Sequence, residues 1–226
     1  MEHASGEMVA FYEAWVVREE QIVADLTADA LPSRRRAALV GAAVDHVADY
    51  YEHKARLADR DVVAALDPRW LNPLERTFLW AWGWKPALAF RFADDVIAAS
   101  SSCSQQQRRA LDRLRAATAE AEREMDREVA AAQESLAGPR VLAALRRPQQ
   151  PRARNGEDDA VAAVGRSLRV LLAAADALRE RTVRDIVAVL GTDQAGAFLA
   201  AMMRFHLGVH RAGRNWGSGN GGRRGV

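Results

Sequence analysis

The stretch that decides the fold is residues 46–90, HVADYYEHKARLADRDVVAALDPRWLNPLERTFLWAWGWKPALAF. A tyrosine pair in a helical pattern leads through an acidic turn to a proline-bounded segment, and four of the chain's six tryptophans lie here. Large aromatic side chains are costly to leave in water, so we expect this stretch to build the core of a helical domain. The aromatic side chains that we assign to this core are Trp15, Tyr50, Tyr51, Trp70, Trp80, Trp82 and Trp84.

The tetrapeptide Asn72-Pro73-Leu74-Glu75 predicts the start of a helix within this stretch. Asparagine is a favoured N-cap, proline suits the first helical position, and Glu75 can return a hydrogen bond to the cap. Gly83 is expected to end the helix. The alternation of large side chains at 78, 80, 82 and 84 also fits a short strand, but the upstream capping signal favours a helix.

A long heptad-patterned helix is predicted to begin at Ser104 and to end at Gly138-Pro139. Its apolar or small positions are Leu111, Leu114, Thr118, Ala121, Met125, Val129, Ala132 and Leu136. Small residues in this stripe favour close packing in a bundle over a leucine zipper, although pairing with a second copy is a further alternative. Other helical patterns precede and follow, and no segment predicts a sheet. The expected fold class is therefore all-α, a single multi-helix bundle.

The domain is expected to span residues 7–217. Residues 146–159 lack apolar periodicity and hold two prolines, so we interpret them as a disordered internal loop. The glycine-rich end of the chain is interpreted as a tail from Gly213, fully disordered over 218–226.

Composition limits the class of protein. The chain has 226 residues, 49% of them hydrophobic and 27% charged, as in soluble globular proteins, and its longest apolar runs are too short to span a membrane. The single cysteine, Cys103, excludes an internal disulfide. The net charge is only +2, so no strong attraction to nucleic acid is expected. Two arginine clusters, 34–36 and the run at 146, 147, 152 and 154, could nevertheless hold phosphates or an import receptor.

His206 and His210 are the candidate ligands for a metal or a haem, because a spacing of four places them on one helical face. Neither a HExxH pattern nor a Glu-x-x-His pair accompanies them. The plainer interpretation is two partly exposed histidines near a helix C-terminus, where the dipole favours positive charge. No catalytic motif occurs, so we expect no enzyme, no metal and no obligatory cofactor.

The chain resembles the Delay-of-Germination family of plants, the seed dormancy control domain that TGA-type bZIP factors also carry. The segments that carry the resemblance run in order over most of the chain: FYEAWVVREEQ, HVADYYEHKARLADRDV, DPRWLNPLERTFLWAWGWKPALAF, EREMDREVAAAQ, LLAAADALRERTV and DQAGAFLAAMMRFHLGVHRAGRNWG. The closest kind is the stand-alone Delay-of-Germination-like protein, and a pollen-aperture member of the family is the alternative.

The resemblance implies a non-enzymatic regulator in the nucleus or cytoplasm, acting in seed dormancy, abscisic acid or stress responses, or in pollen development. It implies protein partners such as signalling phosphatases, transcription factors or calmodulin. Two alternatives stay open. One is a sensor of haem or a lipid, and the other is direct DNA binding, although the basic region of the bZIP members is missing here.

Overall fold

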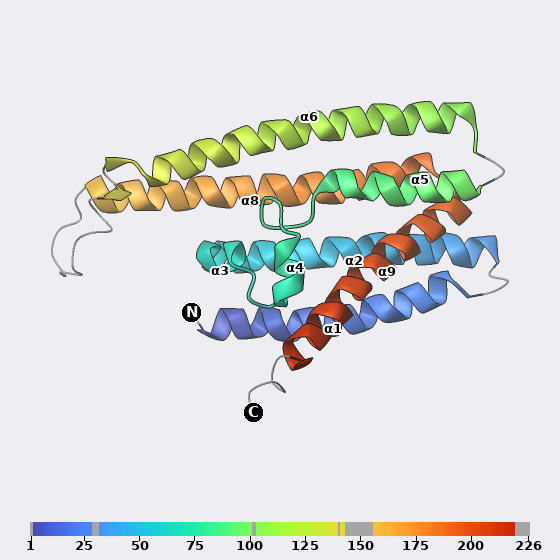
Figure 1. Cartoon of the computed structure of the whole chain (residues 1–226), viewed down its shortest axis with the longest axis horizontal. Coiled ribbons are helices and arrows are strands. Elements are labelled where there is room, and N and C mark those ends of the chain that lie inside the picture. Colours follow the sequence, from blue (N-terminus) through green and yellow to red (C-terminus); the bar gives the residue numbers. More distant parts are fainter. Residues whose placement is uncertain (1, 29–31, 101–102, 140, 143–155, 220–226) are drawn as a thin grey trace.

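The computed structural model describes residues 2–28, 32–100, 103–139, 141–142 and 156–219, and these form helices and short connections (Figure 1). The elements are α1 (Glu2–Leu26), α2 (Ser33–Arg60), α3 (Val62–Leu66), α4 (Pro73–Thr77), the 3-10 helix η1 (Pro86–Leu88), α5 (Ala89–Ala99), α6 (Gln105–Leu136), α8 (Gly156–Val189) and α9 (Thr192–Gly219). Within the described ranges there is no strand, only an isolated bridge between Trp80 and Gly83. The predicted all-α class is confirmed.

Helices α1, α2, α8 and α6 run nearly parallel to one another in Figure 1, and α9 crosses α1 and α2 obliquely. Helix α9 also packs on α4 and α5, so it joins segments far apart in sequence. The main core lies where α2, α5, α8 and α9 meet, and it includes Ala43, Phe90, Ile186 and Phe198. Burial of such apolar side chains is the main force that holds the helices together.

The heptad helix forms as predicted. Ser104 caps α6 through a reciprocal capping box with Gln107. Leu111, Thr118 and Met125, each seven residues after the last, are buried, and α6 packs along α8. The small side chain of Thr118 allows α6 to lie close to α8. The apolar stripe of α6 therefore packs against another helix of the same chain.

The prediction that the helix starting at Pro73 continues to Gly83 is wrong, because only its first turn forms. The capping box of Asn72 and Glu75 is present, but α4 ends at Thr77. The chain then makes a tight turn, in which the backbone N–H and C=O groups of Trp80 and Gly83 bond reciprocally. Ala81 and Trp82 have positive φ angles of 41° and 62°, a costly conformation for side-chain-bearing residues. We call residues 80–84 the tryptophan loop.

A buried ion cluster explains why the tryptophan loop is stable. Lys54 and Arg179 are fully buried, and both hold Asp176, at 3.0 and 2.7 Å. Their remaining donors reach backbone oxygens of the loop: Lys54 Nζ lies 2.8 Å from the Trp82 oxygen, and the Arg179 guanidinium bonds the oxygens of residues 80, 81 and 84. Because these carbonyls receive charged donors, the loop needs no helical hydrogen bonds.

The C-terminal helix is longer than expected, because α9 includes the glycines from Gly213 to Gly219. At Gly213 a Cβ atom would collide with the side chain of Asn72, the N-cap of α4. The glycine therefore allows close packing of α9 on α4. Helix α8 likewise begins at Gly156, inside the predicted loop, while residues 146–155 of that loop and 220–226 of the predicted tail lie outside the described residues.

Candidate functional site

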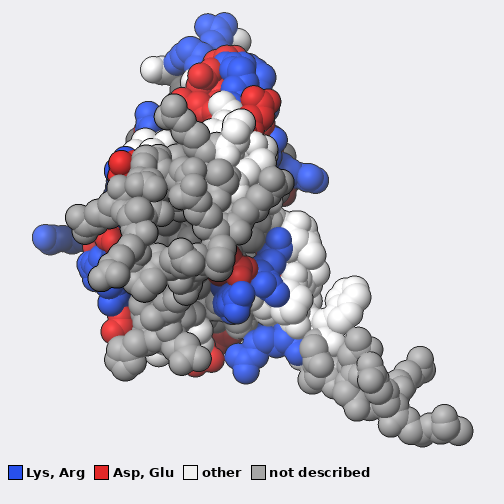
Figure 2. Space-filling model, turned by 90° about the vertical axis from the view of Figure 1, so that its left-hand side faces the viewer, with Lys and Arg blue, Asp and Glu red and all other residues white. Residues whose placement is uncertain are grey.

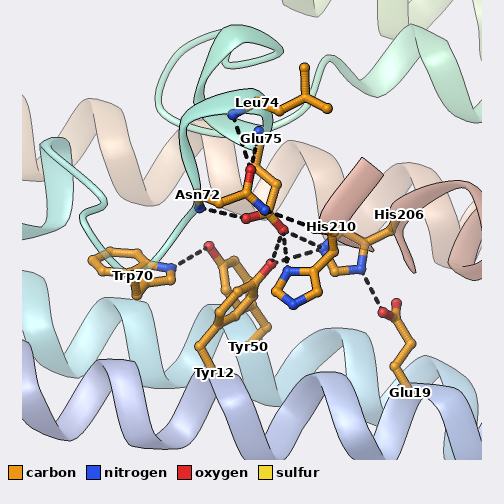
Figure 3. Close-up of polar contacts among 9 residues, drawn as sticks. All are labelled: Tyr12, Glu19, Tyr50, Trp70, Asn72, Leu74, Glu75, His206 and His210. Carbon is orange, nitrogen blue, oxygen red and sulfur yellow. Dashed lines mark hydrogen bonds and ion pairs between the residues drawn. The ribbon is translucent and has the colours of Figure 1, made fainter. Parts of the chain in front are cut away.

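The two candidate histidines do lie together, and they face acidic side chains from distant parts of the chain (Figure 3). His206 Nδ1 is 2.5 Å from Glu19 on α1, and its Nε2 is 3.0 Å from the hydroxyl oxygen of Tyr12. His210 Nδ1 is 2.8 Å from Glu75 on α4. We call Tyr12, Glu19, Glu75, His206 and His210 the His–Glu cluster, and it fastens α9 to α1 and α4.

Glu75 is the hub of this cluster. One carboxylate oxygen accepts the Tyr12 hydroxyl at 2.6 Å and faces both histidines, and the other accepts the backbone N–H of Asn72 at 2.6 Å. Asn72 in turn donates to the backbone oxygen of His210 at 3.1 Å. The capping box predicted for α4 therefore also places a carboxylate under α9.

The hydrogen bonds assign protons within the cluster. Tyr12 has one proton, which it donates to Glu75, so its oxygen accepts from His206 Nε2. The second ring nitrogen faces Glu19, so both nitrogens act as donors when His206 is an imidazolium. Burial alone would lower its pKa, but the charges and hydrogen bonds of Glu19 and Glu75 outweigh burial and raise the pKa of His206 to about 9.

The pKa values of the two carboxyl groups in the cluster, Glu19 and Glu75, shift in opposite directions. Burial raises the pKa of Glu19, and the nearby His206 only partly opposes this. Burial by itself would also raise the pKa of Glu75. Hydrogen bonds from His206, Tyr12, Asn72 and His210 outweigh burial and lower this pKa to about 2. Burial and the charge of Glu75 raise the pKa of Tyr12. Near neutral pH the cluster thus holds an ionised Glu75 against a protonated His206.

A cavity of about 490 Å³ opens beside the cluster, between α1, α2, the segment from α4 to α5, and α9. Glu19, Glu75 and His206 line it, whereas His210 does not. The remaining wall is mainly aromatic and aliphatic: Tyr12, Trp15, Val47, Tyr50, Tyr51, Leu71, Phe78, Leu79, Trp84, Leu88, Phe92, Met202, Met203, Phe205 and Val209. A largely apolar cavity of this size with a few converging polar groups is typical of small-molecule sites.

The predicted aromatic residues are distributed between core and cavity. Trp70 and Tyr51 are buried, while Trp15, Tyr50 and Trp84 are half-buried and line the cavity. The tyrosine pair receives indole N–H groups from the downstream tryptophans, Trp70 to Tyr50 at 3.3 Å and Trp84 to Tyr51 at 2.7 Å. These two hydrogen bonds join the tyrosine-bearing first half of the 46–90 stretch to its tryptophan-bearing second half.

Trp80 and Trp82 are also half-buried and pack at the α6–α8 end of the core. Trp80 donates its indole N–H to Asp126 on α6 at 2.7 Å. These two side chains fix the tryptophan loop against the bundle and do not line the cavity.

Sequence reasoning missed Tyr12 and Glu19 and recognised Glu75 only as a helix cap. A helical spacing of seven between Tyr12 and Glu19 on α1 was available as a signal, but polar residues at such spacing are common on solvated faces. Only the packing of α9 on α1 turns them toward a histidine.

The cluster as arranged does not fit haem. His206 faces the cavity, but its two ring nitrogens already form hydrogen bonds with Tyr12 and Glu19. Its raised pKa also favours the protonated ring, whereas a histidine that binds iron must be neutral. His210 lies outside the cavity wall. Among the described side chains, no group of three histidines, cysteines or acids is arranged to hold a metal ion.

Of the two arginine clusters, only residues 34–36 lie in the described part of the chain. Arg36 forms an ion pair with Asp193 at 3.0 Å, and residues 146, 147, 152 and 154 are outside the described ranges. On the face drawn in Figure 2, the basic and acidic side chains are interspersed. The ion pair with Asp193 balances one arginine of the 34–36 cluster and gives no support to the DNA-binding alternative. No helix in the described residues is both long and apolar enough to cross a bilayer.

Comparison with known proteins matches residues 20–94 to the family described as seed dormancy control. Protein DOG1-like 4 of Arabidopsis thaliana is 28% identical, with 90% of each chain covered. Protein RESPONSE TO ABA AND SALT 1 of the same plant is also 28% identical, covering 90% of this chain and 94% of that protein. The bZIP transcription factor TGA10 of Nicotiana tabacum is 25% identical over 86% of this chain, which corresponds to 39% of the longer factor.

Proposed function

We propose, from the premise that this chain belongs to the Delay-of-Germination family of seed dormancy control proteins, that it is a non-enzymatic plant regulator which binds other proteins. The similarity to a bZIP factor over most of the chain supports a role linked to transcription, and the name of a second relative points to abscisic acid and salt responses. The nucleus and the cytoplasm are the proposed locations.

The observation that carries this proposal is the internal pairing of the reactive side chains. Tyr12, Glu19, Glu75 and His206 bond to one another and thereby connect helices, and the Lys54–Asp176–Arg179 cluster does the same for the tryptophan loop. Groups used in this way stabilise a scaffold. The outer helical faces are then the surfaces for partners, and a phosphatase, a transcription factor or calmodulin is the class of partner proposed.

Affinity purification from plant extract tests the proposal. The chain should retain the same partners in repeated experiments, and the retention should depend on the fold. Arg179→Met is the destabilised control, because it removes the donor that holds the tryptophan loop. Partners that bind both proteins equally, or no reproducible partner at all, would contradict the proposal.

A second candidate, a small-molecule sensor, is favoured by the cavity itself. An apolar cavity wide enough for a ligand has a free-energy cost in lost packing, which a bound ligand would offset. Haem is the less favoured ligand, because His206 is engaged with Glu19 and Tyr12. Addition of haem tests it directly: a Soret band lost in His206→Ala would establish haem binding, and an unchanged spectrum would remove haem from consideration.

A further inference from the structure

We infer that the surface where α5 and α9 meet is a docking site for an acidic amphipathic helix of a partner protein. Its apolar anchor is the phenylalanine patch, which we define as Phe78, Phe92 and Phe205. This inference rests on the proposed function, protein binding, and names the surface and the chemistry of the partner. It follows from three aromatic rings that meet at the surface and from the cations beside them.

The three rings of the phenylalanine patch come from different elements. Phe78 is the C-cap of α4, Phe92 belongs to α5 and Phe205 to α9. The centre of the Phe205 ring lies 6.5 Å from that of Phe78 and 5.5 Å from that of Phe92. Phe92 is half-buried and packs against the main core, so it attaches the patch to the rigid part of the molecule.

The phenylalanine patch leaves much of its aromatic surface in water. Phe78 is 52% exposed and Phe205 is 41% exposed. Single exposed apolar side chains are ordinary, but large ones in contact with each other are typical of interaction surfaces. Aromatic side chains are also the most frequent anchors of protein interfaces, because each buries a large area with few rotatable bonds.

The surface of α9 beside Phe205 is low. Ala201 lies four residues before it and Gly208 three residues after it, so both share its helical face. A Cβ atom at Gly208 would meet open space. A partner helix can therefore approach the Phe205 ring closely. Such an approach suits an amphipathic helix, whose apolar side chains recur every three or four residues.

The cations beside the phenylalanine patch favour an acidic partner. Arg91 adjoins Phe92 and Arg204 adjoins Phe205, and both arginines are exposed. Within the described ranges neither of them forms an ion pair. Lys85, also exposed, lies only 3.8 Å from Glu122, which partly balances it.

The acidic side chains of α5 do not cancel these charges. Asp94 is paired with Arg115 of α6 at 2.5 Å. Asp95 is exposed one turn after Arg91 and offsets at most one positive charge. A partner with carboxylates beside its apolar anchors therefore gains charge-assisted contacts here, whereas a basic partner is repelled.

Fluorescence anisotropy of labelled model peptides tests the inference on the full chain. The acidic probe is an amphipathic helix of phenylalanine, leucine and glutamate. One matched peptide replaces its glutamates by lysine, and a second replaces its apolar residues by serine. The acidic probe should bind at least about tenfold more tightly than either, and added salt should weaken it. Equal binding of the acidic and basic peptides, or no binding of the acidic one, would overturn the inference.

Variants of the patch locate the contact. Phe78→Ala and Phe205→Ala should each weaken the acidic probe about fivefold or more, as loss of an anchor does, whereas Val17→Ala, at an α1 site 66% exposed, should not. Arg204→Glu should weaken it about tenfold, and Arg109→Glu on α6 is the control for net charge. Thermal unfolding checks each fold. Because Arg204 forms no ion pair within the described ranges, unchanged affinity in Arg204→Glu would overturn the inference even if an alanine variant were unstable.

Affinity purification separates this surface from the proposed function. Reproducible partners that wild type and Arg204→Glu retain equally would overturn the docking site while protein binding itself remained. A dimer of this chain that Phe205→Ala abolishes would assign the patch to a second copy and also overturn the inference. If no peptide binds and no partner is retained, both proposals fail.

Discussion

The proton on His206 should make the stability of this protein depend on pH in a defined window. Glu19 and Glu75 raise the pKa of His206 from 6.5 to about 9 against the effect of burial. A folded-state pKa above the unfolded one means that the cluster's stabilisation is complete below pH 6.5 and is lost as pH rises through about 9. A shift of that size corresponds to about 3 kcal/mol. Because the His206 side chain is 30% exposed, solvent screening should reduce the effect to about 2 kcal/mol.

Lys54 titrates in an overlapping range with the opposite sign. Burial lowers its pKa to about 8, although Asp176 partly opposes this, so stability from this group rises with pH above that value. The effect of His206 must therefore be measured as a difference between wild type and His206→Gln. Urea unfolding of both proteins from below pH 6.5 to above pH 9 gives that difference.

The difference in unfolding free energy should shrink by about 2 kcal/mol across the window. Glu19→Gln should flatten the same profile, because it removes the first charge that stabilises the imidazolium. His53→Gln removes a histidine outside the cluster and is the control for loss of an imidazole. A difference that stays constant from one end of the window to the other would refute the proton assignment.

Three further substitutions test the packing. Arg179→Met should destabilise the protein by about 3–5 kcal/mol in urea, because it leaves buried carbonyls of the tryptophan loop and a buried carboxylate without their donor; a loss below 1 kcal/mol would count against this account. Gly213→Ala should cost about 1–3 kcal/mol through its clash with the N-cap side chain of α4, while Gly208→Ala, which has open space, should not destabilise. Equal melting temperatures of these two variants would be contrary to the proposed close contact. Trp70→Ala should cost about 3–5 kcal/mol, whereas Trp216→Ala, at a site 72% exposed, should change stability by less than about 0.5 kcal/mol; similar losses would disprove the assignment of Trp70 to the core.

Local signals in the sequence were sufficient for much of the fold. The capping boxes at Asn72 and Ser104 form as expected, because each requires only residues within one helical turn. The heptad pattern from Leu111 to Ala132 likewise predicts the buried face of α6, since helical spacing alone decides which side chains share a face.

The tryptophan loop shows where local signals fail. Residues 78–84 carry no helix breaker before Gly83, yet the chain leaves the helix at Thr77. The donors that stabilise this turn are on Lys54 and Arg179, which are 28 and 95 residues away from their loop partners Trp82 and Trp84. No window of local sequence contains that information.

The sequence by itself determined the helical class, the capped starts of α4 and α6, and the spacing that puts His206 and His210 on one face, because these depend on contacts within a turn or two of helix. Only the tertiary structure decided that Glu19, 187 residues before His206, meets it and that a cavity opens beside them. The physical reason is that charge pairing and cavity shape depend on how α1, α4 and α9 pack, and packing brings together side chains whose separation in sequence carries no periodic signal.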